Sequence, residues 1–161
     1  MYSFSFKPII NENSKILILG TMPGIKSLEM RQYYAHEQNA FWKILFLLFD
    51  EAYSNKYKIR LDLVLNNKIA VWDTLKQCQR PGSLDSDIKH AEPNDISSLI
   101  KDYHNIKTLA FNGKYAEKYY KKFNSPITGI NYLSLPSTSP ANAGYKFTDK
   151  LNAWSEIKQF L

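Results

Sequence analysis

Four polar and aromatic side chains lie within one short segment and could together bind or activate a ligand. They are Tyr33, Tyr34, His36 and Asn39. An aromatic ring can stack on a planar ligand, and amide or imidazole groups can hydrogen-bond to it. The alternative is that both tyrosines pack against the core and that His36 binds a backbone carbonyl. Because the cluster follows the turn at residues 21–24 (TMPG), we favour a pocket wall.

Two further polar side chains stand where apolar runs end. Asp73 closes the run 68–73, and Asn112 follows the run 108–111. A carboxylate in such a position can accept hydrogen bonds from a ligand, or it can cap the turn that follows. Asn112-Gly113 is also a common turn dipeptide. Both interpretations stay open for Asp73 and for Asn112.

The segment 136–143 (PSTSPANA) concentrates small hydroxyl residues and prolines. Hydroxyl groups and free backbone amides suit contacts with phosphate, and prolines stiffen a loop enough to act as a wedge. The alternative is a surface loop with no special role. The candidate contact residues in this segment are Ser137, Thr138, Ser139, Pro140, Ala141 and Asn142.

Positive charge is in moderate excess, with a formal net charge of +6 and a pI of about 9.2. This balance is compatible with a phosphate-backbone partner. Lys114, Lys118, Lys121 and Lys122 fall near one face of a predicted helix. Such a run is usually a solvated surface, but at the mouth of a crevice it would contact phosphates. Lys114 is the nearest of the four to an expected strand end.

Apolar runs alternate with amphipathic segments along the chain. Strands are predicted at 15–19, 68–73, 108–111 and 131–135. Helices are predicted at 39–49 with Asn39 as N-cap, at 92–103, at 114–123, and at 148–161 with Thr148 as N-cap. This alternation predicts an α/β fold with a parallel sheet covered on both faces. Ligands bind such sheets at the carboxyl ends of the strands.

Four loops are therefore expected to meet in one crevice. They span residues 21–39, 73–85, 112–114 and 136–143. The loop at 79–85 (QRPGSLD) is predicted to have no regular structure. These segments are also the richest in Gly, Pro, Ser and Asn, so the expected site coincides with the unusual composition.

Composition excludes several classes of protein. A length of 161 residues suits one domain over 1–161, and the single Cys78 cannot form an internal disulfide, a structural zinc site or an iron–sulfur cluster. The three histidines lack metal-ligand spacing, and neither a phosphate-binding loop nor a GxSxG elbow is present. We expect no metal and no cofactor. With no signal peptide and no long apolar run, we expect a soluble, cytoplasmic protein without membrane contact.

The run ILILGTMPGIKSLEMRQYYAHEQNAFWKIL resembles the first motif of the mismatch-specific uracil and hypoxanthine glycosylases. Downstream, VWDTLKQCQRPGSLD, FNG and LPSTSPANA are similar to the hypoxanthine-DNA glycosylase branch of the uracil-DNA glycosylase superfamily. The resemblance covers residues 16–154. It implies a three-layer α/β/α sandwich around a four-stranded parallel sheet, and an enzyme that flips a deaminated base out of DNA and hydrolyses its bond to the sugar.

The resemblance also implies a role for each matching residue. Asn39 matches the catalytic asparagine of this branch, Tyr34 the aromatic that stacks on the base, and Asp73 a polar position facing the base. The expected base-binding set is Gly20, Thr21, Met22, Tyr34, His36, Asp73 and Asn112. The expected DNA-binding set is Ser137, Thr138, Ser139, Pro140, Ala141, Asn142 and Lys114.

Three positions depart from the pattern of the family. Met22 replaces an asparagine that positions water, Leu135 replaces a histidine that supports the departing base, and Glu37 replaces a proline. Met22 and Leu135 keep open the alternative of an inactive DNA-binding member of the same fold. A nucleosidase acting on small molecules, built on a similar open sheet, is a second alternative, which the segment 136–143 disfavours. We expect a monofunctional enzyme acting on double- or single-stranded DNA. It is expected to be a monomer, because duplex DNA must reach the crevice.

Overall fold

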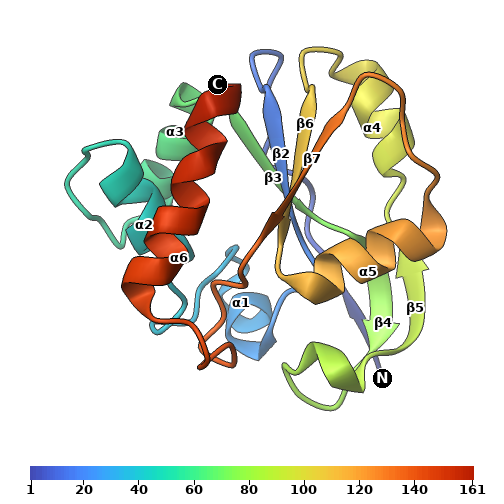
Figure 1. Cartoon of the computed structure of the whole chain (residues 1–161). Helices are drawn as coiled ribbons and strands as arrows, with labels where there is room; N and C mark the ends of the chain where they lie inside the picture. The colour runs from blue at the N-terminus through green and yellow to red at the C-terminus, as the bar shows by residue number, and fades with distance from the viewer.

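Four parallel strands form the centre of the molecule, in the order β3-β2-β6-β7 (Figure 1). The computed structural model describes residues 1–161. The strands are β2 (Ile16–Gly20), β3 (Ile69–Asp73), β6 (Thr108–Asn112) and β7 (Asn131–Leu135). All four predicted strands are confirmed, each to within one residue at either end.

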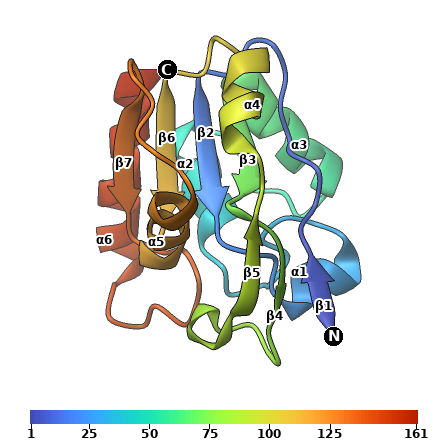
Figure 2. The ribbon, with the colours of Figure 1, turned by 90° about the vertical axis from the view of Figure 1, so that its right-hand side faces the viewer.

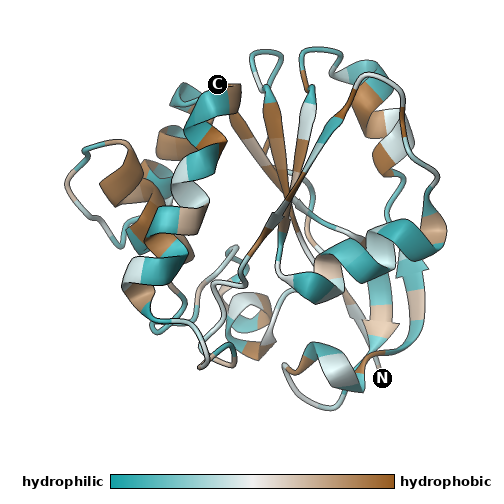
Figure 3. Ribbon diagram, in the orientation of Figure 1, coloured by the Kyte–Doolittle hydropathy of each residue, from teal (hydrophilic) through white to brown (hydrophobic).

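Helices cover both faces of this sheet. The face on the left of Figure 1 carries α2 (Phe41–Leu48), α3 (Tyr57–Asn66) and α6 (Phe147–Trp154), and the opposite face carries α4 (Ile96–Asp102) and α5 (Lys114–Phe123). Alternate residues of β2 enter the two cores: Ile16 and Ile18 belong to one, Leu17 and Leu19 to the other. Burial on both faces explains why β2 and most of β3 are continuous apolar runs, as Figure 3 shows by its colours, whereas the edge strand β7 exposes Asn131, Tyr132 and Ser134. The predicted three-layer α/β/α architecture is confirmed.

A second, antiparallel sheet lies beyond the carboxyl end of β3 (Figure 2). It contains β1 (Tyr2–Phe4), β4 (Leu75–Gln79) and β5 (Lys89–Pro93), in the order β1-β4-β5. Its strands were not predicted because none of them contains an aliphatic run: β1 exposes two aromatic side chains, and β4 and β5 expose mainly polar ones. Gln79 accordingly ends a strand, and a 3₁₀ turn at Asp85–Asp87 interrupts the expected loop.

The helix expected at 92–103 was wrong at its start. Glu92 and Pro93 instead pair with β4, and α4 begins only at Ile96, where the Asp95 carboxylate accepts a hydrogen bond from the Ser98 amide at 3.1 Å. Main-chain pairing with β4 outweighs the helix-start character of Pro93 in this segment.

Both predicted N-caps were misplaced. Helix α2 is capped by Ala40, although the Asn39 Oδ1 atom does accept a hydrogen bond from the Phe41 amide at 3.0 Å. Helix α6 is capped by Lys146, so Thr148 lies inside the helix, and the chain continues as a 3₁₀ helix over Ser155–Phe160.

Two helices were not predicted. Helix α1 (Ile25–Met30) lies within the first long loop, and the sequence of α3 itself has only a weak amphipathic pattern. No helix in the structure combines the length and apolar character that crossing a bilayer requires.

Candidate functional site

The carboxyl ends of the parallel strands lie side by side and enclose a cavity. Gly20 of β2 pairs with Asp73 of β3, and Asn112 of β6 pairs with Leu135 of β7. The strand order reverses between β2 and β6, which is where open α/β sheets bind ligands. The cavity has a volume of about 300 Å³, which suits one small planar group and not a duplex.

Almost every residue selected from the sequence lines this cavity. The set includes Gly20, Thr21, Met22, Tyr34, His36, Asn39, Asp73, Asn112, Ser137, Thr138, Ser139, Pro140 and Ala141. Lys114 and Asn142 do not. They line an adjoining groove of about 750 Å³, which shares Ser137 and Ser139 with the cavity. The cavity and the groove are therefore neighbouring parts of one surface depression, with a shared wall.

Tyr34 and Asp73 meet at Gly20. A Cβ atom on Gly20 would lie 2.9 Å from the Tyr34 Oη atom and 2.6 Å from the Asp73 Oδ1 atom, so only glycine fits there. The Tyr34 ring stacks on Phe41 with centroids 3.9 Å apart. Its φ of 53° is left-handed, a conformation that non-glycine residues rarely adopt. The surrounding packing therefore holds Tyr34 in a backbone conformation that is unfavourable for a tyrosine.

Asp73 is a buried carboxyl group with little to neutralise it. Its side chain is 4% exposed, and its Oδ2 atom has no hydrogen-bond partner. Burial, together with the charge of Asp85 and against the opposing charge of Arg80, raises the pKa of Asp73 to about 7. Perturbed carboxyl groups of this kind are typical of functional sites. The expected role of Asp73 as a turn cap finds no support, because no turn amide donates to its carboxylate.

Asn39 and His36 lie nearer the mouth of the cavity. The Oδ1 atom of Asn39 is occupied by the Phe41 amide, so its Nδ2 group remains available to donate. His36 is exposed, and its Nδ1 atom accepts a hydrogen bond from the Gln38 amide at 3.2 Å. The alternative for His36, binding to a backbone carbonyl, is therefore wrong.

Asn112 anchors the loop that follows β7. Its Nδ2 group donates to Thr138 Oγ1 at 2.9 Å, and its Oδ1 atom accepts from the Thr138 amide at 2.9 Å. The Thr138 carbonyl accepts from the Ala40 amide at 3.0 Å. The end of β6, the 136–143 loop and the start of α2 are thereby joined at one buried residue.

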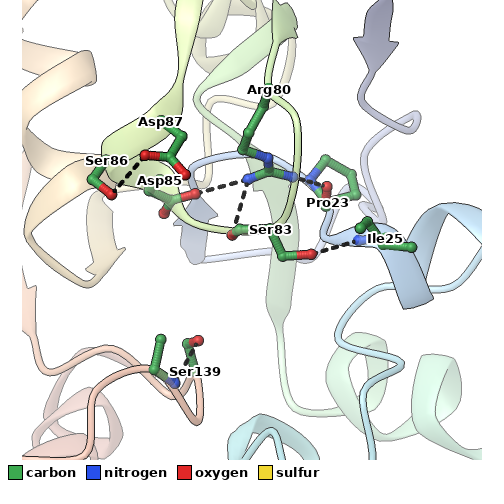
Figure 4. A network of polar contacts seen from close by, with 9 residues as sticks. Pro23, Ile25, Arg80, Ser83, Asp85, Ser86, Asp87 and Ser139 are labelled. Carbon is green, nitrogen blue, oxygen red and sulfur yellow. Dashed lines mark hydrogen bonds and ion pairs between the residues drawn. The ribbon is translucent and has the colours of Figure 1, made fainter.

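A buried arginine, Arg80, holds together the wall of the cavity that is formed by the 80–85 loop and the turn after β2. Arg80 donates to the carbonyls of Pro23 and Ser83 and forms an ion pair with Asp85 at 2.9 Å (Figure 4). The Ser83 hydroxyl accepts from the Ile25 amide at 2.9 Å. These contacts join the 80–85 loop to the turn after β2.

The role of this arginine and of Asp85 was missed by the sequence analysis. The only available signal was the position of Arg80 beside Pro-Gly in a loop already assigned to the site. Burial raises the pKa of the Asp85 carboxyl, while nearby Thr21 and Arg80 lower it. Lys26, the one lysine that lines the cavity, was missed as well.

The three departures from the family pattern occupy different environments. Met22 lines the cavity but is buried among Leu75, Cys78 and Tyr119. Leu135 belongs to the core beneath α2 and α6 and faces the groove instead of the cavity. Glu37 is exposed and does not line the cavity. No group of three or more His, Cys, Asp or Glu side chains is placed to hold a metal ion.

Comparison with known proteins agrees with this geometry. The sequence matches the uracil DNA glycosylase superfamily over residues 8–158. It is 41% identical to a hypoxanthine DNA glycosylase of Methanosarcina barkeri, with 94% of each chain covered, and 34% identical to one of Methanosarcina acetivorans, with 98% of each covered. A solution NMR structure of a candidate uracil DNA glycosylase from M. acetivorans superimposes with a TM-score of 0.83 at 31% identity, covering 98% of this chain and 96% of the other. The chain therefore belongs to the uracil DNA glycosylase superfamily.

Proposed function

We propose that this protein is a monofunctional DNA glycosylase that hydrolyses the bond between a deaminated base, foremost hypoxanthine, and its deoxyribose. One observation carries the proposal: a base-sized cavity, lined by Tyr34, Asn39 and Asp73, in a chain that is 41% identical to a hypoxanthine DNA glycosylase. A cavity of this size at the end of the sheet requires the nucleotide to leave the duplex.

The reaction breaks the bond between the base nitrogen and C1′ of the sugar. The bonding electrons leave with the base, and water adds to C1′ with loss of a proton. Donors preorganised around the base stabilise the negative charge that develops on it. The free Nδ2 group of Asn39 is suited to that role or to holding the attacking water.

Asp73 supports a preference for deaminated bases. An ionised carboxylate can only accept hydrogen bonds. It therefore matches the ring N–H that hypoxanthine and uracil present, and it opposes the ring nitrogen of adenine, which is itself an acceptor. Uracil is for this reason the second candidate substrate.

A monofunctional reaction requires that no amine of the protein attacks the sugar. Lys26, the only lysine that lines the cavity, is half-exposed, and its Nζ atom lies 3.9 Å from the Glu29 carboxylate. We expect no covalent adduct when borohydride is added during turnover, and an abasic strand that breaks only after alkali treatment.

The test is base release from labelled duplexes that carry hypoxanthine, uracil or an undamaged purine. Asn39→Ala is compared with Asn131→Ala, an exposed asparagine at the other end of the sheet. We expect release of hypoxanthine that is lost in Asn39→Ala and retained in Asn131→Ala. Release of uracil alone would change the proposed substrate. Intact DNA binding without any release would indicate an inactive DNA-binding protein, and release from free nucleosides alone would indicate a nucleosidase.

A further inference from the structure

Two buried polar atoms, both on residues that line the cavity, have no hydrogen-bond partner in the protein. They are the Tyr34 Oη atom and the Asp73 Oδ2 atom. Leaving a buried polar group without a hydrogen bond costs free energy, so such atoms are rare and call for an explanation. Here both belong to residues that line the cavity and flank the same point beside Gly20. A bound ligand is the simplest source of the missing hydrogen bonds.

The two groups differ in what they offer a ligand. Burial, with the nearby charge of Asp73, raises the pKa of Tyr34 far above its ordinary value, so its hydroxyl keeps its proton and can donate. The ionised Asp73 carboxylate can only accept. Together they present a donor beside an acceptor. The complementary ligand edge has a carbonyl oxygen next to a ring N–H.

The ring of Tyr34 supports this interpretation. One of its faces already stacks on Phe41 at 3.9 Å, and the neighbouring Tyr33 directs its own hydroxyl away, donating to the Lys7 carbonyl at 2.8 Å. A phenylalanine at position 34 would keep the stacking and leave no unpartnered atom. Packing against Phe41 thus accounts for the ring of Tyr34 but not for its hydroxyl group.

We propose that Tyr34 is a specificity-determining residue, whose hydroxyl donates to the exocyclic oxygen of the deaminated base while Asp73 accepts from the adjacent ring N–H. Deamination of adenine changes both of these positions, from an amino group and an acceptor nitrogen to a carbonyl and an N–H. This inference rests on the proposed function and assigns Tyr34 to the edge of the base. It replaces the stacking role implied by family resemblance, because one ring cannot both lie flat on a base and donate its hydroxyl to the edge of that base.

The experiment compares wild type with Tyr34→Phe on two substrates, under single-turnover conditions at pH 8, where Asp73 is mostly ionised. One duplex carries hypoxanthine and the other carries unsubstituted purine, which lacks both the exocyclic oxygen and the ring N–H. The quantity compared between the two duplexes is therefore the change in rate caused by the substitution, and not the absolute rate. We expect Tyr34→Phe to release hypoxanthine about 10- to 100-fold more slowly, the usual effect of losing one buried hydrogen bond to substrate. Release of purine should change less than about threefold, because that base makes no bond to the hydroxyl.

Two controls separate recognition from folding. Tyr120→Phe removes the hydroxyl of another buried tyrosine, which contacts Tyr132 on the opposite face of the sheet, and should leave both rates unchanged. Binding of Tyr34→Phe to a duplex with a baseless tetrahydrofuran site should match wild type. Equal losses on both substrates, or no loss on hypoxanthine, would overturn the inference while the proposed function stands. No base release by the wild type would overturn both.

Discussion

Asp73 gives the most quantitative prediction, because its carboxyl group is buried and its pKa is strongly displaced. The pKa rises from 3.8 to about 7 on folding. The folded protein therefore holds a proton that the unfolded chain releases between these values. Since the displacement is upward, the free energy of unfolding should fall as pH rises from about 4 to about 7, and then level off.

The size of the effect follows from the displacement. Roughly three pKa units correspond to about 4 kcal/mol of lost stability above pH 7. Asp73→Asn removes the buried charge and keeps the shape of the side chain. Its stability should equal that of wild type near pH 4 and exceed it by about 4 kcal/mol at pH 8, which in a chain of this length raises Tm by roughly 10 °C.

The assay is urea unfolding followed by far-ultraviolet circular dichroism at pH values from 4 to 8. Asp87→Asn, an exposed aspartate in the 3₁₀ turn, serves as control and should parallel wild type at every pH. If wild type and Asp73→Asn keep a constant difference across this range, the carboxyl does not titrate as described and the reasoning is refuted. The stabilised variant should also lose its preference for deaminated over normal purines.

Two further predictions concern the walls of the site. Arg80→Met removes the buried guanidinium beside Asp85 and should lower the free energy of unfolding, measured in urea, by about 3 kcal/mol. Release of hypoxanthine should also slow. An unchanged free energy of unfolding would contradict the view that Arg80 holds the 80–85 loop against the turn after β2. Gly113 has a φ of 94°, and a Cβ there would lie 2.8 Å from the Ser137 Cβ. Gly113→Ala should therefore lower stability more than Gly129→Ala, which shares the left-handed backbone with a φ of 83° but meets no atom within 4 Å. If the two variants lost equal stability, the left-handed backbone alone would explain the loss, and the contact with Ser137 would contribute nothing.

The parallel sheet could be predicted because its strands are buried on both faces. Such strands appear in the sequence as uninterrupted aliphatic runs, as in Ile16–Gly20. The antiparallel sheet has no aliphatic run in its sequence, because Lys89–Pro93 is mostly exposed and is held by main-chain pairing with Leu75–Gln79. Main-chain pairing between distant segments has no signature in either segment alone.

The location of the site could be predicted, but its internal contacts could not. Four loops at the carboxyl ends of parallel strands must meet, whatever their side chains. The pairing of Asn112 with Thr138 and of Arg80 with Asp85 depends on how those loops fold against one another. Asn112 was predicted to bind the base, whereas both ends of its side-chain amide form hydrogen bonds with Thr138.

The anchoring of Thr138 has a consequence for engineering this protein. Thr138 is buried and bound on three sides, whereas Pro140 and Ala141 in the same loop are exposed. Randomising these two positions should therefore leave the interior undisturbed. Both positions line the cavity, and Ala141 also lines the adjoining groove, so a library built there would vary the preferred base together with the contacts to DNA on an unchanged, stable fold.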